Sequence, residues 1–267
     1  MTESILTLDQ ALALQSRRSR LSLLPVLAVL LVILWAFDYS GAFDTARYRD
    51  ALHTLFTLAA DALPPDFFRW SHWGKPLLET LAMSIAATVL AALVALPLGV
   101  LSAKGLSPAL LRRCVQLVLN VIRSIPDLVW GVMFVAAVGF GPLPGILAMA
   151  CHSVGMLGKF YAEIIEHIDP APAQALRGQG VPPLGVVRFA VWPQILPQLA
   201  DVTLYRWEHN LRAATVMGVI GAGGLGLELV TAFHLFEYRE AMALIIVMLV
   251  LVSLVHAGSA LLRKALI

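Results

Sequence analysis

The stretch TLAMSIAATVLAALVALPLGVLSA, residues 80–103, contains no charged side chain and ends just before Lys104. An α-helix needs about 20 mostly apolar residues to cross roughly 30 Å of hydrocarbon, and this stretch is long enough. Pro97 and Gly99 lie within it and are candidate bending points. The stretch predicts a transmembrane helix, and we expect an all-α membrane protein.

The composition of the whole chain supports a membrane location. Apolar residues make up 59% of the chain and charged residues only 13%, which lies outside the range of ordinary soluble domains. The net charge of +2 is too small to indicate a nucleic-acid partner. Cys114 and Cys151 lie in apolar segments, so we interpret them as reduced packing residues. The excess of apolar surface is expected to face membrane lipid.

Five further apolar stretches bring the predicted number of transmembrane helices to six. The first, residues 21–37, follows a cytoplasmic segment 1–20 and is interpreted as an uncleaved span, because aromatic residues and not a cleavage site follow it. Residues 38–76 are polar and contain a proline break, which indicates a periplasmic segment with interfacial helices. Residues 77–267 form the predicted transmembrane core, with spans at residues 110–138, 146–165, 195–220 and 241–262.

Basic residues are unevenly distributed over this six-span arrangement. According to the positive-inside rule, the side with more basic residues faces the cytoplasm. Both chain termini lie on that side and are therefore predicted to be cytoplasmic. That side carries Arg17, Arg18, Arg20, Lys104, Arg112, Arg113, Lys159, Arg177, Arg188, Arg263 and Lys264, and the other side carries Arg47, Arg49, Arg69, Lys75 and Arg239.

Charged residues within predicted spans cost about 2.5 to 3.5 kcal/mol each at the helix centre, and five of them stand out as functional candidates. Arg123 and Asp127 lie four residues apart on one predicted helical face. Glu208 and Arg212 have the same spacing, whereas Arg206 has no such partner. Two interpretations stay open for each residue: polar contacts between helices, and a cationic pathway for an oxyanion that uses guanidinium donors. For the set as a whole we favour the pathway.

Motifs for catalysis or cofactor binding are weak. Residues 221–226, GAGGLG, match G-x-G-x-x-G, but a predicted span precedes them where a strand is required, so we interpret them as a helix end or a close approach between helices. Phe160 follows Gly158-Lys159 where a P-loop needs Ser or Thr. The seven histidines show no metal-ligand spacing, and no G-x-S-x-G occurs. We expect no enzyme activity, no metal site and no cofactor bound by this chain.

The loop between the fourth and fifth predicted spans is rich in proline, and residues 173–179 within it predict a short helix. A spaced motif occupies residues 174–197, with QALRGQG followed by AVWP and LP. It resembles the EAA loop of ABC importer permeases, in which Glu-Ala-Ala is followed after three residues by Gly and after nine more by a short apolar stretch ending in Pro. Ala175 and Gly180 match, and nine residues separate Gly180 from Ala190. Gln174 departs from the pattern, which has an acidic residue there. The segments RSIPDLVW at 123–130, HSVGMLGK at 152–159 and YRWE at 205–208 resemble phosphonate-type permeases in particular.

This resemblance implies a type I ABC importer permease with six transmembrane helices and a cytoplasmic coupling loop at about residues 166–194. Gln174, Ala175, Leu176 and Gly180 would contact the ATPase. The permease would form a homodimer that works with a cytoplasmic ATPase dimer, which holds ATP and Mg, and with a periplasmic solute-binding protein. It would move a phosphonate-like phosphorus oxyanion, such as phosphonate, phosphite or hypophosphite, across the bacterial inner membrane by alternating access.

Two alternatives to this function stay open. One is an ABC permease for another small solute, such as an amino acid or methionine, because the coupling loop does not specify the substrate. The other is a secondary transporter that works alone, which we favour less because the sequence has no evident inverted repeat.

Overall fold

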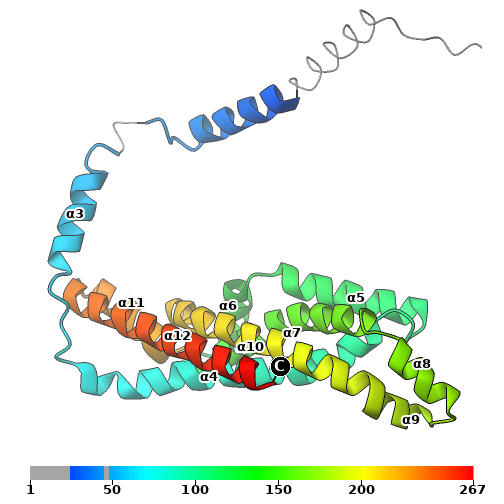
Figure 1. Cartoon of the computed structure of the whole chain (residues 1–267). Helices are drawn as coiled ribbons and strands as arrows, with labels where there is room; N and C mark the ends of the chain where they lie inside the picture. The colour runs from blue at the N-terminus through cyan, green and yellow to red at the C-terminus, as the bar shows by residue number, and fades with distance from the viewer. Residues whose placement is uncertain (1–24, 45–47, 267) are drawn as a thin grey trace, which may run out of the picture. The chain divides into compact units, whose positions relative to one another are not determined.

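The computed structural model describes residues 25–44 and 48–266, and these residues form helices and their connections without a strand (Figure 1). The chain divides into two compact units, Met1–Ala60 and Asp61–Ile267. The predicted cytoplasmic segment 1–20 and the first four residues of the predicted span 21–37 lie outside the described residues.

The described part of the first unit consists of short, exposed helices. Residues 25–37 of the predicted first span are helical, within a helix that covers Pro25–Tyr39. This helix is apolar but shorter than the about 20 residues that a perpendicular crossing requires. Helix α3, Ala51–Asp61, follows in the segment that the sequence places outside the membrane, and it has no buried residue.

Four long helices form the body of the second unit: α4 (Gly74–Ser102), α7 (Pro142–Glu166), α10 (Trp192–Met217) and α12 (Tyr238–Leu266). Small side chains allow α4 and α7 to pack closely, because Ala87, Ala91 and Ala95 of α4 are completely buried. A Cβ at Gly99 would lie 2.7 Å from the Cβ of Tyr161. Pro97 does not interrupt α4, so the expected bending point leaves one continuous helix.

The predicted span 110–138 is broken into two helices, α5 (Ala109–Ser124) and α6 (Asp127–Val138), with an angle of 88° between them. Pro126 disfavours helical geometry at the residue before it, and Ile125 is extended, with φ −87° and ψ 122°. This break corrects the expectation of a continuous helix, which followed from apolarity alone.

The glycine-rich motif confirms the interpretation as a helix end and a close approach. A 3₁₀ turn, Gly218–Ile220, ends α10, and Gly221 then adopts φ +80°. Helix α11, Gly224–His234, continues at 44° to α10 and was not predicted from the sequence. A Cβ at Gly226 would lie 2.0 Å from the carbonyl oxygen of Thr215, so only glycine permits this contact.

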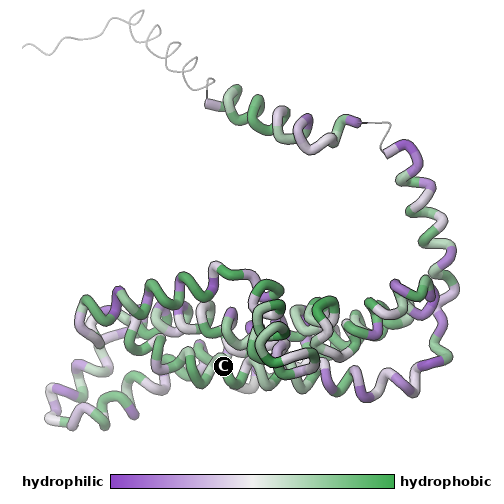
Figure 2. Tube along the Cα trace, turned by 180° about the vertical axis from the view of Figure 1, so that it is seen from behind, coloured by the Kyte–Doolittle hydropathy of each residue, from purple (hydrophilic) through white to green (hydrophobic). Residues whose placement is uncertain are grey.

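Several shorter helices lie at the two ends of the second unit. Helix α8 (Ala171–Gly178), helix α9 (Pro183–Val186) and a π-helical turn at Val187–Val191 lie at one end. Helix α11 and the start of α12 lie at the opposite end (Figure 1). Hydrophilic stretches concentrate towards these ends, whereas the helices between them are mostly apolar (Figure 2).

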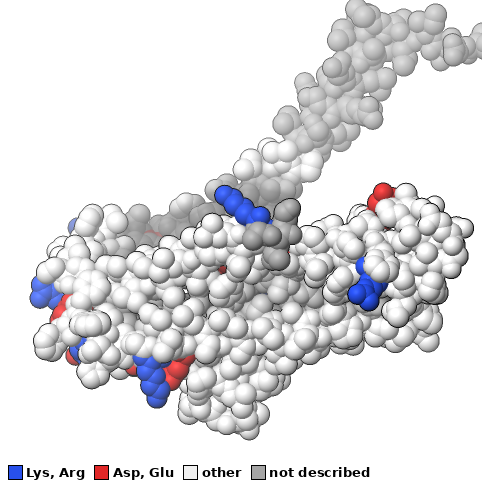
Figure 3. All heavy atoms as spheres, turned by 60° about the horizontal axis from the view of Figure 1, so that its bottom comes forward, with Lys and Arg blue, Asp and Glu red and all other residues white. Residues whose placement is uncertain are grey.

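Within the described residues, three helices are long and apolar enough to cross a membrane, or up to five if each of the two bent pairs counts as one span. A total of six requires the helix Pro25–Tyr39 as well. On the face shown in Figure 3, most charged atoms lie towards the ends of the bundle, and the surface between them is largely uncharged. The second unit therefore presents an apolar belt to lipid.

Candidate functional site

The coupling loop, residues 166–194, contains the predicted short helix. We expected a helical stretch at residues 173–179, and α8 covers Ala171–Gly178. Ala173 is buried against Val186 and Ala190, whereas Gln174 and Ala175 are exposed and Leu176 is partly buried. The EAA-like motif therefore presents Gln174 and Ala175 outward and uses its other side to pack on the loop.

Gly180 ends α8 in a Schellman arrangement. Its φ is +77°, and its N–H donates to the carbonyl of Arg177 at 3.0 Å. The N–H of Val181 donates to the carbonyl of Leu176 at 3.1 Å, and both side chains pack on the same small cluster. A left-handed residue at this position is normally glycine, which explains why the motif requires Gly180.

A polar clasp joins the two ends of the coupling loop. The N–H of Asp169 donates to Gln194 Oε1 at 3.0 Å, and Gln194 Nε2 donates to the carbonyl oxygens of Ala190 and Asp169 at 2.7 and 3.3 Å. The tip of the loop is apolar, because Leu184 and Phe189 are 80% and 68% exposed. The loop therefore has a fixed base on α10 and an exposed apolar tip.

Arg206 is the most deeply buried of the five predicted pathway residues, with 4% of its surface exposed. Its Nε donates to Ser153 Oγ at 2.8 Å, Ser153 donates to Asn210 at 2.9 Å, and Asn210 donates to Thr88 Oγ1 at 2.9 Å. We call Arg206, Ser153, Asn210 and Thr88 the polar chain. Arg206 Nη2 is buried and has no hydrogen-bond partner within the described residues.

Asp127 begins α6 directly after the break, so the expected pair with Arg123 on one helical face is corrected. The nearest side-chain nitrogens belong to histidines: His152 Nδ1 lies 3.1 Å from Oδ1, and His209 Nε2 lies 3.9 Å from Oδ2. Arg206 is close enough for its charge to act on Asp127. The structure therefore brings two of the five predicted residues, Asp127 and Arg206, into one electrostatic environment.

A cavity of about 430 Å³ adjoins this carboxylate, and we call it the Asp127 cavity. It receives one further predicted pathway residue, Arg212, whose side chain has no ion-pair partner among the residues that the structure describes. The cavity is lined by Asp127, Leu128, His152, His209, Arg212, Ala213, Val216 and Met217.

The expected pair between Glu208 and Arg212 is also corrected. Glu208 turns to α12, where Arg263 Nη2 and His256 Nδ1 both lie 2.8 Å from its carboxylate oxygens. Arg263 Nε also lies 3.2 Å from Asp201 Oδ1 on α10. These contacts join α10 to α12, which matches the first interpretation of the charged residues as polar contacts between helices.

Arg123 likewise lies in a packing position. Its Nε donates to Asn120 Oδ1 at 3.1 Å, one turn earlier on α5. A Cβ at Gly155 would lie 2.8 Å from both the backbone nitrogen and the Cβ of Arg123. Arg123 therefore marks the close crossing of α5 and α7, and it does not line the Asp127 cavity.

Sequence reasoning missed the histidines and the neutral polar residues at this site. His152 and Ser153 lie in the resembling segment 152–159, but their roles depend on packing between helices. His152 Nδ1 hydrogen-bonds to the carbonyl of Ile125 at 3.0 Å, at the break that places Asp127. An unmatched charge such as Arg206 indicates that polar partners are needed, but not which helix supplies them.

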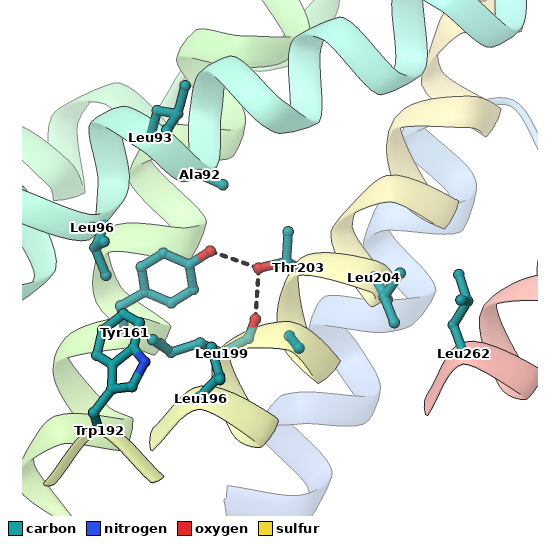
Figure 4. A pocket seen from close by; sticks show the side chains of 11 residues that line it. Ala92, Leu93, Leu96, Tyr161, Trp192, Leu196, Leu199, Thr203, Leu204 and Leu262 are labelled. Carbon is teal, nitrogen blue, oxygen red and sulfur yellow. Dashed lines mark hydrogen bonds between the residues drawn. The ribbon is translucent and has the colours of Figure 1, made fainter. Parts of the chain in front are cut away.

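A second pocket, of about 410 Å³, is apolar and lies among α4, α7, α10 and α12 (Figure 4). Its hydroxyl groups satisfy each other, since Tyr161 Oη and Thr203 Oγ1 are 2.6 Å apart and Thr203 donates to the carbonyl of Leu199. Leu93, Leu96 and other aliphatic side chains form most of the remaining wall. This pocket offers no charged donor for an oxyanion.

A charged cluster lies at the end of the bundle opposite the coupling loop. Arg69 Nη1 lies 3.1 Å from Glu240 Oε2 and 3.7 Å from Glu237 Oε2. A hydrogen bond with the neighbouring Glu240 carboxyl group raises the pKa of Glu237. The contact between Arg69 and Glu237 is screened by solvent, whereas Glu240 is buried, and none of these residues lines the Asp127 cavity.

Sequence comparisons relate the chain to transport permeases. Residues 95–266 match the family described as binding-protein-dependent transport system inner membrane component. The phosphite transport system permease protein PtxC of Stutzerimonas stutzeri is 48% identical over 234 residues, which cover 87% of this chain and 85% of that protein. The phosphate-import permease protein PhnE of Mycolicibacterium smegmatis is 36% identical over 224 residues, which cover 84% of this chain and 41% of that protein.

A comparison of structures agrees on the fold. The MetNI methionine ABC transporter in an inward-facing conformation matches with a TM-score of 0.64 and 22% sequence identity. The match covers 73% of this chain and 96% of that chain. At this level of identity the match establishes the fold only.

Proposed function

Because this chain belongs to the family of inner-membrane permease components of binding-protein-dependent ABC transporters, we propose that it imports a phosphorus oxyanion of the phosphite or phosphonate type. The identity of 48% with a phosphite permease over most of both chains carries this proposal. Arginine side chains within the membrane helices support it, because guanidinium groups match the geometry of phosphorus oxyanions.

The proposed pathway runs past Asp127, Arg206 and Arg212. Asp127 and Arg212 line the same cavity, and Arg206 provides a buried guanidinium whose Nη2 has no partner among the described side chains. Arg123 and Glu208 belonged to the predicted pathway, but their contacts favour positioning roles at the α5–α7 and α10–α12 contacts. Their part in transport stays a prediction.

We propose a homodimer in which a second copy covers the Asp127 cavity. Arg212 and Leu128 are both exposed in the single chain. A guanidinium at the depth of a transmembrane helix is costly against lipid and normally faces protein or a water-filled pathway. A second permease copy would enclose the cavity and create such a pathway, which alternating access would open to each side in turn.

The coupling loop is the proposed contact with the ATPase dimer, which would hold ATP and Mg. Gln174, Ala175, Leu176 and Gly180 are the residues we assign to this contact or to its geometry. The end of the bundle with the loop would face the cytoplasm, because Lys104, Arg112, Arg113, Lys159, Arg177 and Arg188 belong to it. With the predicted spans, both termini would then be cytoplasmic, and the solute-binding protein would dock at the other end.

The test is the ATPase rate of the complete transporter in nanodiscs, formed from the tagged chain, its ATPase and its solute-binding protein. We expect phosphite or a phosphonate to stimulate ATP hydrolysis, with no stimulation by methionine. Stimulation by methionine alone would overturn the substrate class and favour the general permease alternative. Failure of the chain to associate with an ATPase would overturn the proposed coupling.

A further inference from the structure

We propose that Asp127 selects oxyanions that carry a hydroxyl proton, such as hydrogen phosphite or a phosphonate monoanion, and rejects oxyanions without one, such as sulfate. This inference rests on the proposed function, because it assigns specificity to the same pathway. It adds a selection step within the permease that is separate from selection by the solute-binding protein.

The first observation is an unused hydrogen-bond acceptor on Asp127. Oδ1 is buried and has no hydrogen-bond partner among the described residues. His152 Nδ1 is 3.1 Å away, but its hydrogen bond runs to the carbonyl of Ile125. A carbonyl only accepts, so Nδ1 of His152 carries the proton and gives it to Ile125. The other carboxylate oxygen, Oδ2, also keeps a free acceptor position, because His209 Nε2 at 3.9 Å is too far for a hydrogen bond, and Asp127 lines the cavity.

The second observation is the presence of donors around the same cavity. Arg212 lines it without an ion-pair partner in the described part of the chain, and His209 Nε2 lies 3.9 Å from Asp127 Oδ2. Arg206 adds a positive charge whose field reaches Asp127. A ligand in this cavity thus meets cationic donors together with a carboxylate acceptor.

A hydrogen phosphite ion fits both kinds of group. Its unprotonated oxygen atoms accept hydrogen bonds from guanidinium and imidazole groups, and its P–O–H group donates to a carboxylate oxygen. Sulfate at neutral pH has only acceptor oxygens, so one of them would face the Asp127 carboxylate without an intervening proton. A ligand that leaves a buried polar group of the site without a hydrogen bond binds much more weakly than a ligand that forms this bond. The difference in affinity is larger than the one produced by a single methyl group on the ligand.

The experiment measures equilibrium binding of radiolabelled phosphite and of radiolabelled sulfate to the assembled transporter in nanodiscs, without the solute-binding protein. For the unmodified protein we expect phosphite to bind at least tenfold more tightly than sulfate. Asp127→Asn places an amide N–H beside the oxyanion, so we expect the ratio to fall about tenfold through a gain in sulfate binding. Asp127→Glu retains a carboxylate and should keep sulfate excluded.

Glu163→Gln provides the matched control, because it removes a half-exposed carboxylate that pairs with Lys159 outside the cavity. Its phosphite-to-sulfate ratio should equal that of the unmodified protein. An unchanged ratio in Asp127→Asn would overturn the proposal, and so would equal loss of both anions, because Asp127 would then be a general requirement for binding. If phosphite and phosphonates fail to stimulate the unmodified transporter with its solute-binding protein, the proposed function fails instead.

Discussion

The coupling loop and the polar chain differ in the range of the contacts that form them. Within the loop, α8 ends through bonds from Gly180 and Val181 to residues three and five positions earlier, and Gln194 closes the clasp onto Asp169. The polar chain joins α4, α7 and α10, and 53 residues separate Ser153 from Arg206. The comparison suggests that a change in the loop should affect coupling alone, whereas a change in the polar chain should affect passage and folding together.

Arg206→Ala should have the largest effect. It removes the donor to Ser153 and the charge near Asp127, leaving buried polar groups without partners. We expect phosphite uptake into proteoliposomes to fall at least tenfold and the free energy of unfolding to fall by about 3 to 5 kcal/mol. Arg206→Lys should recover part of the stability but less of the uptake, because lysine lacks the planar fork. Unchanged uptake and affinity in Arg206→Ala would refute the pathway assignment.

Glu208→Gln should reduce stability without changing substrate preference. The amide cannot form the charged contacts with Arg263 and His256, so the α10–α12 contact should lose about 2 kcal/mol. Thermal unfolding in nanodiscs checks this value, and a double-mutant cycle with Arg263→Gln isolates the pair. A change in the ratio of phosphite binding to sulfate binding would instead support a role of Glu208 in the substrate pathway.

Gly180→Ala should disturb the coupling loop alone. A Cβ at this position meets no atom within 4 Å, so the cost comes from the φ of +77° and should be about 1 kcal/mol. We expect weaker association with the ATPase and an unchanged oxyanion-binding ratio. Gly178→Ala is the control, because this glycine also has open space and lies in α8. Equal effects of the two substitutions would contradict the role of the left-handed geometry.

Gln174→Glu should have the smallest effect. It restores the acidic residue of the EAA pattern at an exposed position of α8, where an ion pair contributes at most about 1 kcal/mol. We expect association with the ATPase to tighten up to fivefold at low salt and the gain to disappear at high salt. Titration of the ATPase onto nanodiscs at two ionic strengths measures both values. Weaker association at low salt would show that the partner surface does not offer a cation there.

The helices that were predicted correctly are those whose formation depends on residues close together in the sequence. Residues 173–179 have the composition of a short helix, and Gly180 is placed to end it, so α8 was foreseen within two residues at its start. The long helices α4, α7 and α12 followed from uninterrupted apolar stretches. The broken segment was missed because the apolar stretches on the two sides of residues 123–127 were interpreted as one span, and hydropathy does not give the angle between two helices.

The partners of the charged residues depended on packing between distant helices and were not predictable from spacing. The i,i+4 rule paired Glu208 with Arg212. In the structure, Arg263, 55 residues from Glu208, forms ion pairs with both Glu208 and Asp201. Likewise, His152 reaches Asp127 only because α5 and α6 meet at 88°. Spacing rules describe an isolated helix, and a partner from another helix competes with them in a folded bundle.

The clasp between Asp169 and Gln194 gives the coupling loop a mechanical connection to the polar chain. Gln194 lies in the first turn of α10, and the same continuous helix carries Arg206 twelve residues later, about 18 Å along the axis. A force applied to the loop would therefore be transmitted along the axis of α10 from its first turn. Axial displacement of its base would move the Arg206 guanidinium relative to Ser153 on α7, so work done at the loop would reach the proposed oxyanion pathway through one helix, which contains Pro197 between Gln194 and Arg206.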